Sequence, residues 1–481
     1  MPAEFGPRRR RATASAAADF DAGPAWPQRA RFVVLAVFLV VCALGGGAAR
    51  ADVLSLLYLR PAAVLCLVVL LALPGQVDWR LIRMPLILLV AFALVMLIQL
   101  IPLPPQLWLS LPGHERYGEA ALAAGIPQPW RPLSLAPSLT VNSLVSLLIP
   151  LVVLIGFASV HEGHRPTLIK FFVGIAVASA VLGCIQVIGE PGGPAYLYAF
   201  TNPGLPVGLF SNRNHEAVFL AAMLPFLAAW AVRVPPHQAR TAIVTAAGVG
   251  MFLLIIIVVT GSRAGALTAL VGVLGAFLLL PQPGRERPRL RWALRLLWLA
   301  PLLLVGLAWY LGRFAAIERL LTLQQSSELR LSHAPLVFDI ARNFMPFGTG
   351  FGTFDPVFRN FEPDQMLELQ YFNHAHNDLL ELAMTGGIAA LLVLLAFLLW
   401  AGRRCFVIFV RQRGRKASPM PKAAAFALVI LLVASLFDYP LRTPLVSAFA
   451  ALLCAWLAAP PNSRQSRRRE GAPDAEADQH A

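Results

Sequence analysis

The sequence predicts an all-α polytopic membrane protein with about 12 transmembrane helices. Hydrophobic residues make up 58% of the 481 residues, charged residues make up 14%, and the mean hydropathy is +0.67. Ordinary globular domains are nearer half apolar and a quarter charged. This composition excludes a soluble enzyme, a disordered chain and a secreted disulfide scaffold. A net charge of +15 at this hydropathy does not indicate nucleic-acid binding.

Apolar runs predict the helices in chain order. Each run approaches or exceeds the roughly 20 residues of a spanning helix, and proline, glycine or charged residues separate most of them. Only Gly261 and Ser262 separate the seventh run from the eighth, so one long broken run is an alternative there. The runs are 32–49, 53–73, 84–102, 139–159, 168–189, 215–232, 241–260, 263–280, 293–311, 378–400, 423–438 and 443–459.

The charge pattern predicts which side of the membrane each connection faces. Basic residues gather in the connections on the side of the two termini, most clearly at 285–289 and 411–416, and the positive-inside rule assigns that side to the cytoplasm. The chain then divides into a cytoplasmic disordered tail at 1–31, a transmembrane domain at 32–459 and a cytoplasmic tail at 460–481.

Two outward segments, about 103–138 and 312–377, exceed ordinary connections between helices. Segments of this length are usually functional or partly helical. The second segment contains Gly348, Gly350 and Gly352 at alternate positions. These glycines indicate tight turns rather than a nucleotide-binding loop, because no Lys-Ser or Lys-Thr pair follows them.

Three polar clusters, at 210–216, 260–263 and 374–381, mark the outward starts of predicted helices. Each helix presents its N-terminus outward, with free N–H groups and a partial positive charge. Together with Arg213 and Arg263 these ends predict a phosphate site. Arg263 could instead snorkel to lipid headgroups. No acidic residue lies within ten positions of it, which favours an anionic partner from elsewhere.

The remaining polar residues of these clusters have structural alternatives. Asn212, Asn214 and Ser262 fit helix N-caps. Asp378 with Glu381 fits a capping box of the D-x-x-E kind. In that interpretation their roles are local to the helix ends.

His376 is the predicted general base. It lies two residues before Asp378, the expected N-cap. A helix N-terminus favours the neutral imidazole, which can accept a proton. His374 is a second candidate for the same role. Neither a metal nor a cofactor is expected, because no metal-spaced Cys/His set and no Walker-type loop occurs.

Six short motifs occur in order over residues 131–442, and their combination resembles the O-antigen ligase/polymerase family of bacterial envelope polysaccharide glycosyltransferases. A long outward segment before the His-Asn pair is part of the resemblance. The motifs are 131–140, 208–214, 260–263, Arg330 followed by 346–352, 374–381 and 438–442.

The resemblance implies an enzyme of the bacterial inner membrane with both termini cytoplasmic and a long periplasmic loop. It implies transfer of a glycan from undecaprenyl diphosphate to a sugar hydroxyl at the periplasmic face, without a metal or a nucleotide sugar. The acceptor is lipid A core for a ligase and a growing glycan for a polymerase, and the two stay open. The bilayer is the third partner, and no nucleic acid is expected.

The resemblance also implies roles for residues. Arginines hold the diphosphate, and a histidine assists the acceptor hydroxyl. The expected catalytic residues are His376, Arg263 and Arg330. The residues expected to bind the donor diphosphate are Arg213, Arg263, Arg330, Asn212 and Asn214. His374 and Asn377 are secondary candidates.

A transporter or flippase for polysaccharide or lipid-linked glycan is the alternative function. Transporters often show inverted repeats and helices broken at the midplane. The sequence shows no internal repeat, and its polar motifs lie at predicted helix ends. The pattern therefore favours the transferase.

Overall fold

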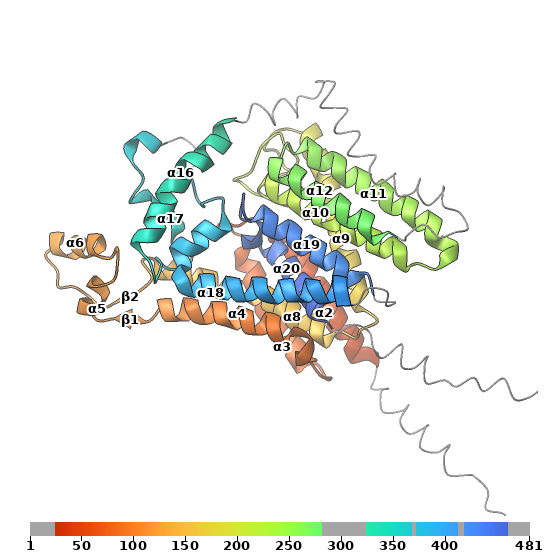
Figure 1. Ribbon diagram of the computed structural model, residues 1–481, viewed down its shortest axis with the longest axis horizontal. Coiled ribbons are helices and arrows are strands. Elements are labelled where there is room, and N and C mark those ends of the chain that lie inside the picture. The colour runs from red at the N-terminus through yellow and green to blue at the C-terminus, as the bar shows by residue number, and fades with distance from the viewer. Residues whose placement is uncertain (1–24, 281–323, 368–371, 412–417, 460–481) are drawn as a thin grey trace, which may run out of the picture.

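The structure is a computed structural model that describes residues 25–280, 324–367, 372–411 and 418–459, and it consists mainly of bundled α-helices (Figure 1). The described elements are α2 (Ala25–Gly45), α3 (Leu56–Ala72), α4 (Trp79–Gln99), β1 (Pro102–Leu103), α5 (Pro105–Leu109), α6 (Glu115–Ala123), β2 (Arg131–Pro132), α7 (Pro137–Ser146), α8 (Leu148–Ser159), α9 (Arg165–Ile188), α10 (Arg213–Arg233), η2 (Pro236–Gln238), α11 (Ala239–Val259), α12 (Arg263–Leu279), α16 (Gln324–Asn343), α17 (Phe354–Arg359), η3 (Asp364–Met366), α18 (Asp378–Phe406), η4 (Val407–Arg411), α19 (Met420–Ala434), η5 (Pro440–Arg442) and α20 (Pro444–Ala458).

Seven helical segments of the described residues are long and apolar enough to cross a membrane. They are α2, α4, α7 with α8, α9, α10, α11, and α18 with η4. Four shorter apolar helices, α3, α12, α19 and α20, contain 10–17 residues each. The helical, multi-span fold class is confirmed. The total of 12 spans stays a prediction, and the run at 293–311 lies outside the described residues.

Helix boundaries follow the apolar runs, with two local findings. Residues 25–31, expected to belong to a disordered tail, form the first turns of α2. The rest of that tail lies outside the described residues. Between α11 and α12, Gly261 adopts a φ of +64° and Ser262 caps α12 by accepting from the Gly265 amide at 2.9 Å. The chain therefore forms two helices there rather than one broken run.

The helix α10 lies at the centre of the bundle, and 89% of the residues in its most apolar stretch are buried. It packs against α9, α11, α12 and α19. Small residues bring α10 and α12 together: a Cβ at Gly265 would lie 2.3 Å from the Cβ of Ala217, and one at Gly272 would lie 2.6 Å from the Ala221 oxygen. Small residues at such seams let helix backbones approach closely.

The two long segments of the sequence pack on each other at one end of the bundle. Figure 1 shows α5, α6, α16 and α17 beyond the α4 and α18 ends. The antiparallel pair β1–β2 joins the two ends of the first segment. Arg116 donates to the Asn360 oxygen at 2.8 Å, and the Leu135 amide donates to the Thr349 oxygen at 2.9 Å. The second segment provides most of a buried apolar cluster that includes Phe344, and Tyr117 and Leu135 of the first segment pack against this cluster.

The glycine-rich turn of the second segment is hydrogen-bonded to α18 at a point where the helix is interrupted. Gly348, Gly350 and Gly352 have φ angles of +75°, +105° and +79°, which confirms the tight turns. Gly387 interrupts α18 with a φ of +61° and a ψ of −159°. The freed backbone pairs with the turn, because the Ile388 amide donates to the Pro346 oxygen at 2.9 Å. The start of α18 is therefore fixed by the turn as well as by its own N-cap.

Replacing Gly387 by alanine tests this joint. The φ and ψ at Gly387 are accessible essentially only to glycine, and a Cβ would lie 2.3 Å from the Pro346 oxygen. We expect Gly387→Ala to destabilise the purified protein by at least about 2 kcal/mol, seen as a lower thermal unfolding temperature in detergent. Gly402→Ala is the matched control in α18, since nothing lies within 4 Å of its Cβ position. Equal unfolding temperatures for the two variants would contradict this account.

Candidate functional site

The candidate site is organised around Asp438, a carboxylate between α19 and η5 with 1% of its side chain exposed. Its Oδ2 accepts a hydrogen bond from Asn214 Nδ2 at 2.6 Å. Its Oδ1 accepts from the Tyr439 amide at 3.0 Å and lies 3.2 Å from His376 Nδ1. A buried carboxylate is tolerated only when it is paired and hydrogen-bonded. Asp438 therefore joins α10, the loop before α18 and the α19–α20 connection.

The N-termini of α10, α12 and α18 are brought together by these and neighbouring contacts. Arg213 Nη1, in the first turn of α10, donates to the Thr260 oxygen just before α12, at 3.3 Å. At α18, the Asp378 amide donates to the Ser435 oxygen at 2.8 Å, at the end of α19. The expected grouping of polar helix ends is thus present, with the α19–α20 connection as its centre.

His376 is held in one orientation by backbone and side-chain geometry. Its φ is +49°, in the left-handed region that few non-glycine residues adopt. A carboxylate can only accept, so His376 Nδ1 donates to Asp438 and the lone pair of the neutral ring is on Nε2. With 15% of its side chain exposed, His376 lies at the edge of the buried cluster.

His374 belongs to a second carboxylate pair. Its Nδ1 lies 3.0 Å from Oε1 of Glu381, which has 1% of its side chain exposed. The same Glu381 accepts from the Ala375 amide at 3.0 Å and pairs with Arg442 Nη1 at 3.0 Å. Arg442 also donates from Nε to Asp378 Oδ1 at 3.0 Å. The two histidines therefore face different carboxylates.

The capping box predicted for α18 is wrong. The N-cap lies one residue earlier than expected, and the two acidic residues of the predicted box pair with another part of the chain. Asn377 is the N-cap: its Oδ1 accepts from the Leu380 amide at 3.0 Å, while its Nδ2 donates to the Leu436 oxygen at 3.2 Å. Asp378 and Glu381 turn to Arg442 instead. A buried ion pair with a distant arginine outweighs the local cap here.

An aromatic ring separates the histidines. The ring centroid of Tyr439 lies 4.3 Å from that of His374, 5.0 Å from that of His376 and 5.1 Å from that of His215. His215 is buried, and its Nε2 lies 3.6 Å from Asp438 Oδ1, beyond hydrogen-bond length. Tyr439 therefore lies among three imidazoles, of which His376 and His215 face Asp438 and His374 faces Glu381.

The remaining expected residues lie in three places. Asn212 is the N-cap of α10 and accepts from the Asn214 amide at 2.8 Å. Asn214 is buried against Asp438, so it is a structural partner of the cluster rather than an open ligand. Arg263 is exposed in the first turn of α12. Arg330 lies on α16, and its side chain falls outside the described part of the structure.

The electrostatics of the cluster favour fixed charges at its centre. Burial alone would raise the pKa of Asp438, but the imidazoles of His215 and His376 outweigh burial and hold that pKa well below its usual range. Partial burial would lower the pKa of Arg442, yet the carboxylates of Glu381 and Asp378 outweigh it and raise that pKa. Asp438 is thus a carboxylate, and Arg442 a cation, throughout the physiological range.

Sequence reasoning missed four members of the cluster as site residues: Asp438, Arg442, Tyr439 and His215. Three of them lie in the motif 438–442, which the resemblance included without assigning roles. The available signal was an acid and an arginine around Pro440 between two apolar runs, where charge is costly and therefore informative. In the part of the chain that the structure describes, no group of three or more His, Cys, Asp or Glu side chains is placed to hold a metal ion.

Comparison with known proteins bears on the centre of the chain. No curated protein matches the sequence. Residues 248–395 match the family model described as O-antigen ligase. This range contains Arg263, Arg330, His374 and His376, and it ends before Asp438. The match shows that residues 248–395 are similar to the O-antigen ligase family, and it supports an assignment of the chain to that family.

Proposed function

We propose that the protein transfers a glycan from undecaprenyl diphosphate to a sugar hydroxyl at the periplasmic face of a bacterial inner membrane. The acceptor is either lipid A core or a growing polysaccharide. The observation that carries the proposal is the pairing of His376 with Asp438 at 3.2 Å, beside the N-termini of α10, α12 and α18. A base and an anion-binding surface are the two groups that this displacement needs.

The donor diphosphate is proposed to bind at the start of α10 and α12. Helix N-termini attract anions through their N–H groups and partial positive charge. Arg213 and Arg263 stand in the first turns of these helices, and Arg263 is exposed. Arg330 is proposed as a third cation for the same diphosphate, on its position in the matched range. Arginine binds phosphate oxygens through two parallel hydrogen bonds.

The reaction then follows as a displacement at the anomeric carbon. The acceptor oxygen forms a bond to that carbon while the bond from the carbon to the diphosphate oxygen breaks. The acceptor proton passes to His376 Nε2, and the diphosphate leaves as an anion on its lipid. Asp438 stabilises the imidazolium that forms, and the arginines stabilise the leaving charge. Every group in this scheme belongs to the chain or its substrates, so the proposal includes no metal.

Replacing His376 by alanine tests the base. A lost general base typically lowers the rate about 10²–10⁴-fold, so purified His376→Ala should transfer poorly from supplied lipid-linked donor while still binding it. His374→Ala is the matched control, because His374 pairs with Glu381 rather than Asp438, and it should be milder. The assay supplies lipid A core and glycan acceptors separately. Retention of most activity by His376→Ala with either acceptor would exclude His376 as the base.

The pH dependence of transfer distinguishes protonation of His376 from protonation of Asp438. Because the pKa of Asp438 is held well below its usual range, its charge contributes stability at every pH above about 4. That contribution is lost only as the pH falls further, through the folded-state pKa. We therefore expect one acid limb between pH 5 and 9, from protonation of the histidine.

The variant Asp438→Asn removes the negative charge that favours imidazolium. Its acid limb should move to lower pH while its maximal rate falls, and transfer rates of the purified variant from pH 5 to 9 measure both effects. An acid limb that stays at the wild-type pH would contradict a direct action of Asp438 on His376.

Substitutions at Arg263 test the donor site. Lysine keeps the charge but loses the two-point hydrogen bonding of the guanidinium. Arg263→Lys should therefore weaken donor binding, and Arg263→Ala should weaken it more, by about tenfold or greater, as charge-assisted bonds are lost. Arg240→Ala is the matched control, because Arg240 is also an exposed arginine in the first turn of a helix, here α11. Normal donor affinity in Arg263→Ala, at normal membrane abundance, would leave Arg263 as a lipid anchor.

A further inference from the structure

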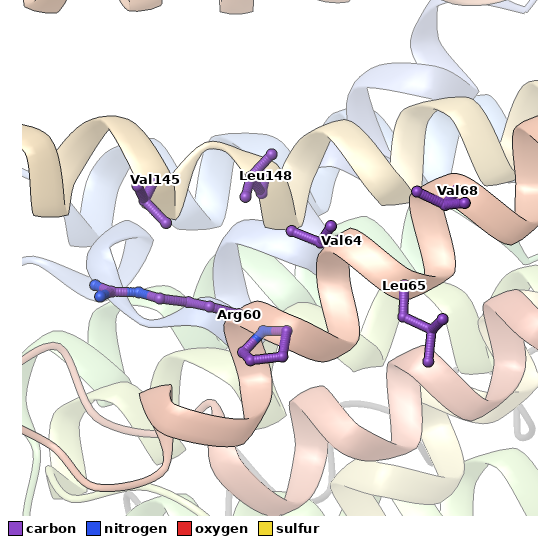
Figure 2. Close-up of a pocket in the computed structure, with 7 residues that line it drawn as sticks. Arg60, Val64, Leu65, Val68, Val145 and Leu148 are labelled. Carbon is purple, nitrogen blue, oxygen red and sulfur yellow. The ribbon is translucent and has the colours of Figure 1, made fainter.

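A groove of about 550 Å³ runs between α3 and the α7–α8 segment (Figure 2). Val64, Leu65 and Val68 line it from α3, and Val145 and Leu148 line it from the other side. Figure 2 shows Val64 and Leu148 pointing toward each other and the Arg60 side chain extending from α3 on the side of Val145. The volume lies within the usual range of small-molecule sites.

The apolar side chains that line the groove from α3 are exposed on the surface of the bundle. Val64, Leu65 and Val68 are 47%, 64% and 57% exposed. In a membrane-spanning bundle such a surface contacts lipid chains. From Arg60 to Val68 the groove follows α3 for about 12 Å, at a rise of about 1.5 Å per residue. A flexible chain can therefore lie along it for a substantial part of one leaflet.

Arg60 places an uncompensated cation at one end of this apolar surface. It lies in the first turns of α3, and its Nη2 donates to Asn142 Oδ1, a neutral amide. Its Nε is buried without a hydrogen-bond partner. Within the described ranges, no carboxylate lies at ion-pair distance from Arg60. A cation beside an apolar surface of a membrane-spanning bundle is costly without an anion, so charge complementarity favours an anionic partner.

We propose that the groove is a binding site for an anionic phospholipid of the bilayer. Its phosphate pairs with Arg60, and one hydrocarbon chain lies against Val64, Val68 and Leu148. The site is separate from the proposed donor site, because α3 packs on α2 and α8 whereas α10 packs on α9, α11, α12 and α19. The inference does not depend on the transfer reaction.

Native mass spectrometry of the full-length protein in detergent, titrated with phosphatidylglycerol or phosphatidylcholine, tests the site. Wild type should bind one phosphatidylglycerol in preference to phosphatidylcholine. Arg60→Gln should lose about fivefold or more of that affinity, as expected for one cation near a lipid phosphate. Asn142→Asp should give the same loss with Arg60 still present, because the new carboxylate would neutralise it. Val64→Trp should reduce binding of both lipids by filling the groove.

Arg50→Gln is the matched control, since Arg50 already pairs with Asp52 at 2.6 Å. It should bind phosphatidylglycerol as wild type does. Thermal unfolding of each variant shows that it is folded, and Asn142→Asp keeps the test decisive if Arg60→Gln unfolds. Unchanged phosphatidylglycerol binding in both variants would overturn the proposal. Displacement of phosphatidylglycerol from the groove by a tighter, Arg60-dependent undecaprenyl diphosphate would also overturn it, in favour of the donor lipid.

Discussion

The buried carboxylate of Asp438 determines how α10, the loop before α18 and the α19–α20 connection meet. Taking a carboxylate out of water costs several kcal/mol unless hydrogen bonds replace the lost hydration. Asn214 from α10, His376 from the loop before α18 and the Tyr439 amide provide them. Removal of one of these donors leaves a buried carboxylate oxygen of Asp438 with fewer hydrogen bonds to replace its hydration. The position of the histidine is therefore tied to the packing of helices that lie far apart in the sequence.

The start of α18 is fixed from two further directions. The glycine-rich turn pairs with the opened backbone at Gly387. Arg442 pairs with both Asp378 and Glu381 in the first turn. These contacts hold the loop that carries His374 and His376 between the bundle and the packed long segments. Such support fits the proton acceptor that we propose, because a small displacement of a catalytic group lowers the rate strongly.

The sequence predicted what depends on local pattern. Apolar runs located the helices, and helix-end chemistry identified Asn212 and Ser262 as caps. The cap of α18 was misplaced because Asn377 and Asp378 are both good caps, and only the distant Arg442 decides between them. Asp438 was unassigned for a similar reason. Its partners lie 62 and 224 positions away in the chain, and no periodicity encodes such contacts.

A double-mutant cycle of His376→Ala and Asp438→Asn, read as the rate of glycan transfer at the pH optimum, tests the central claim most directly. Residues that act as one unit are strongly non-additive. If Asp438 acts through His376, the double variant should be no slower than His376→Ala alone, within about threefold. Multiplication of the two single effects would contradict the account, because it would mean that the carboxylate and the imidazole act independently.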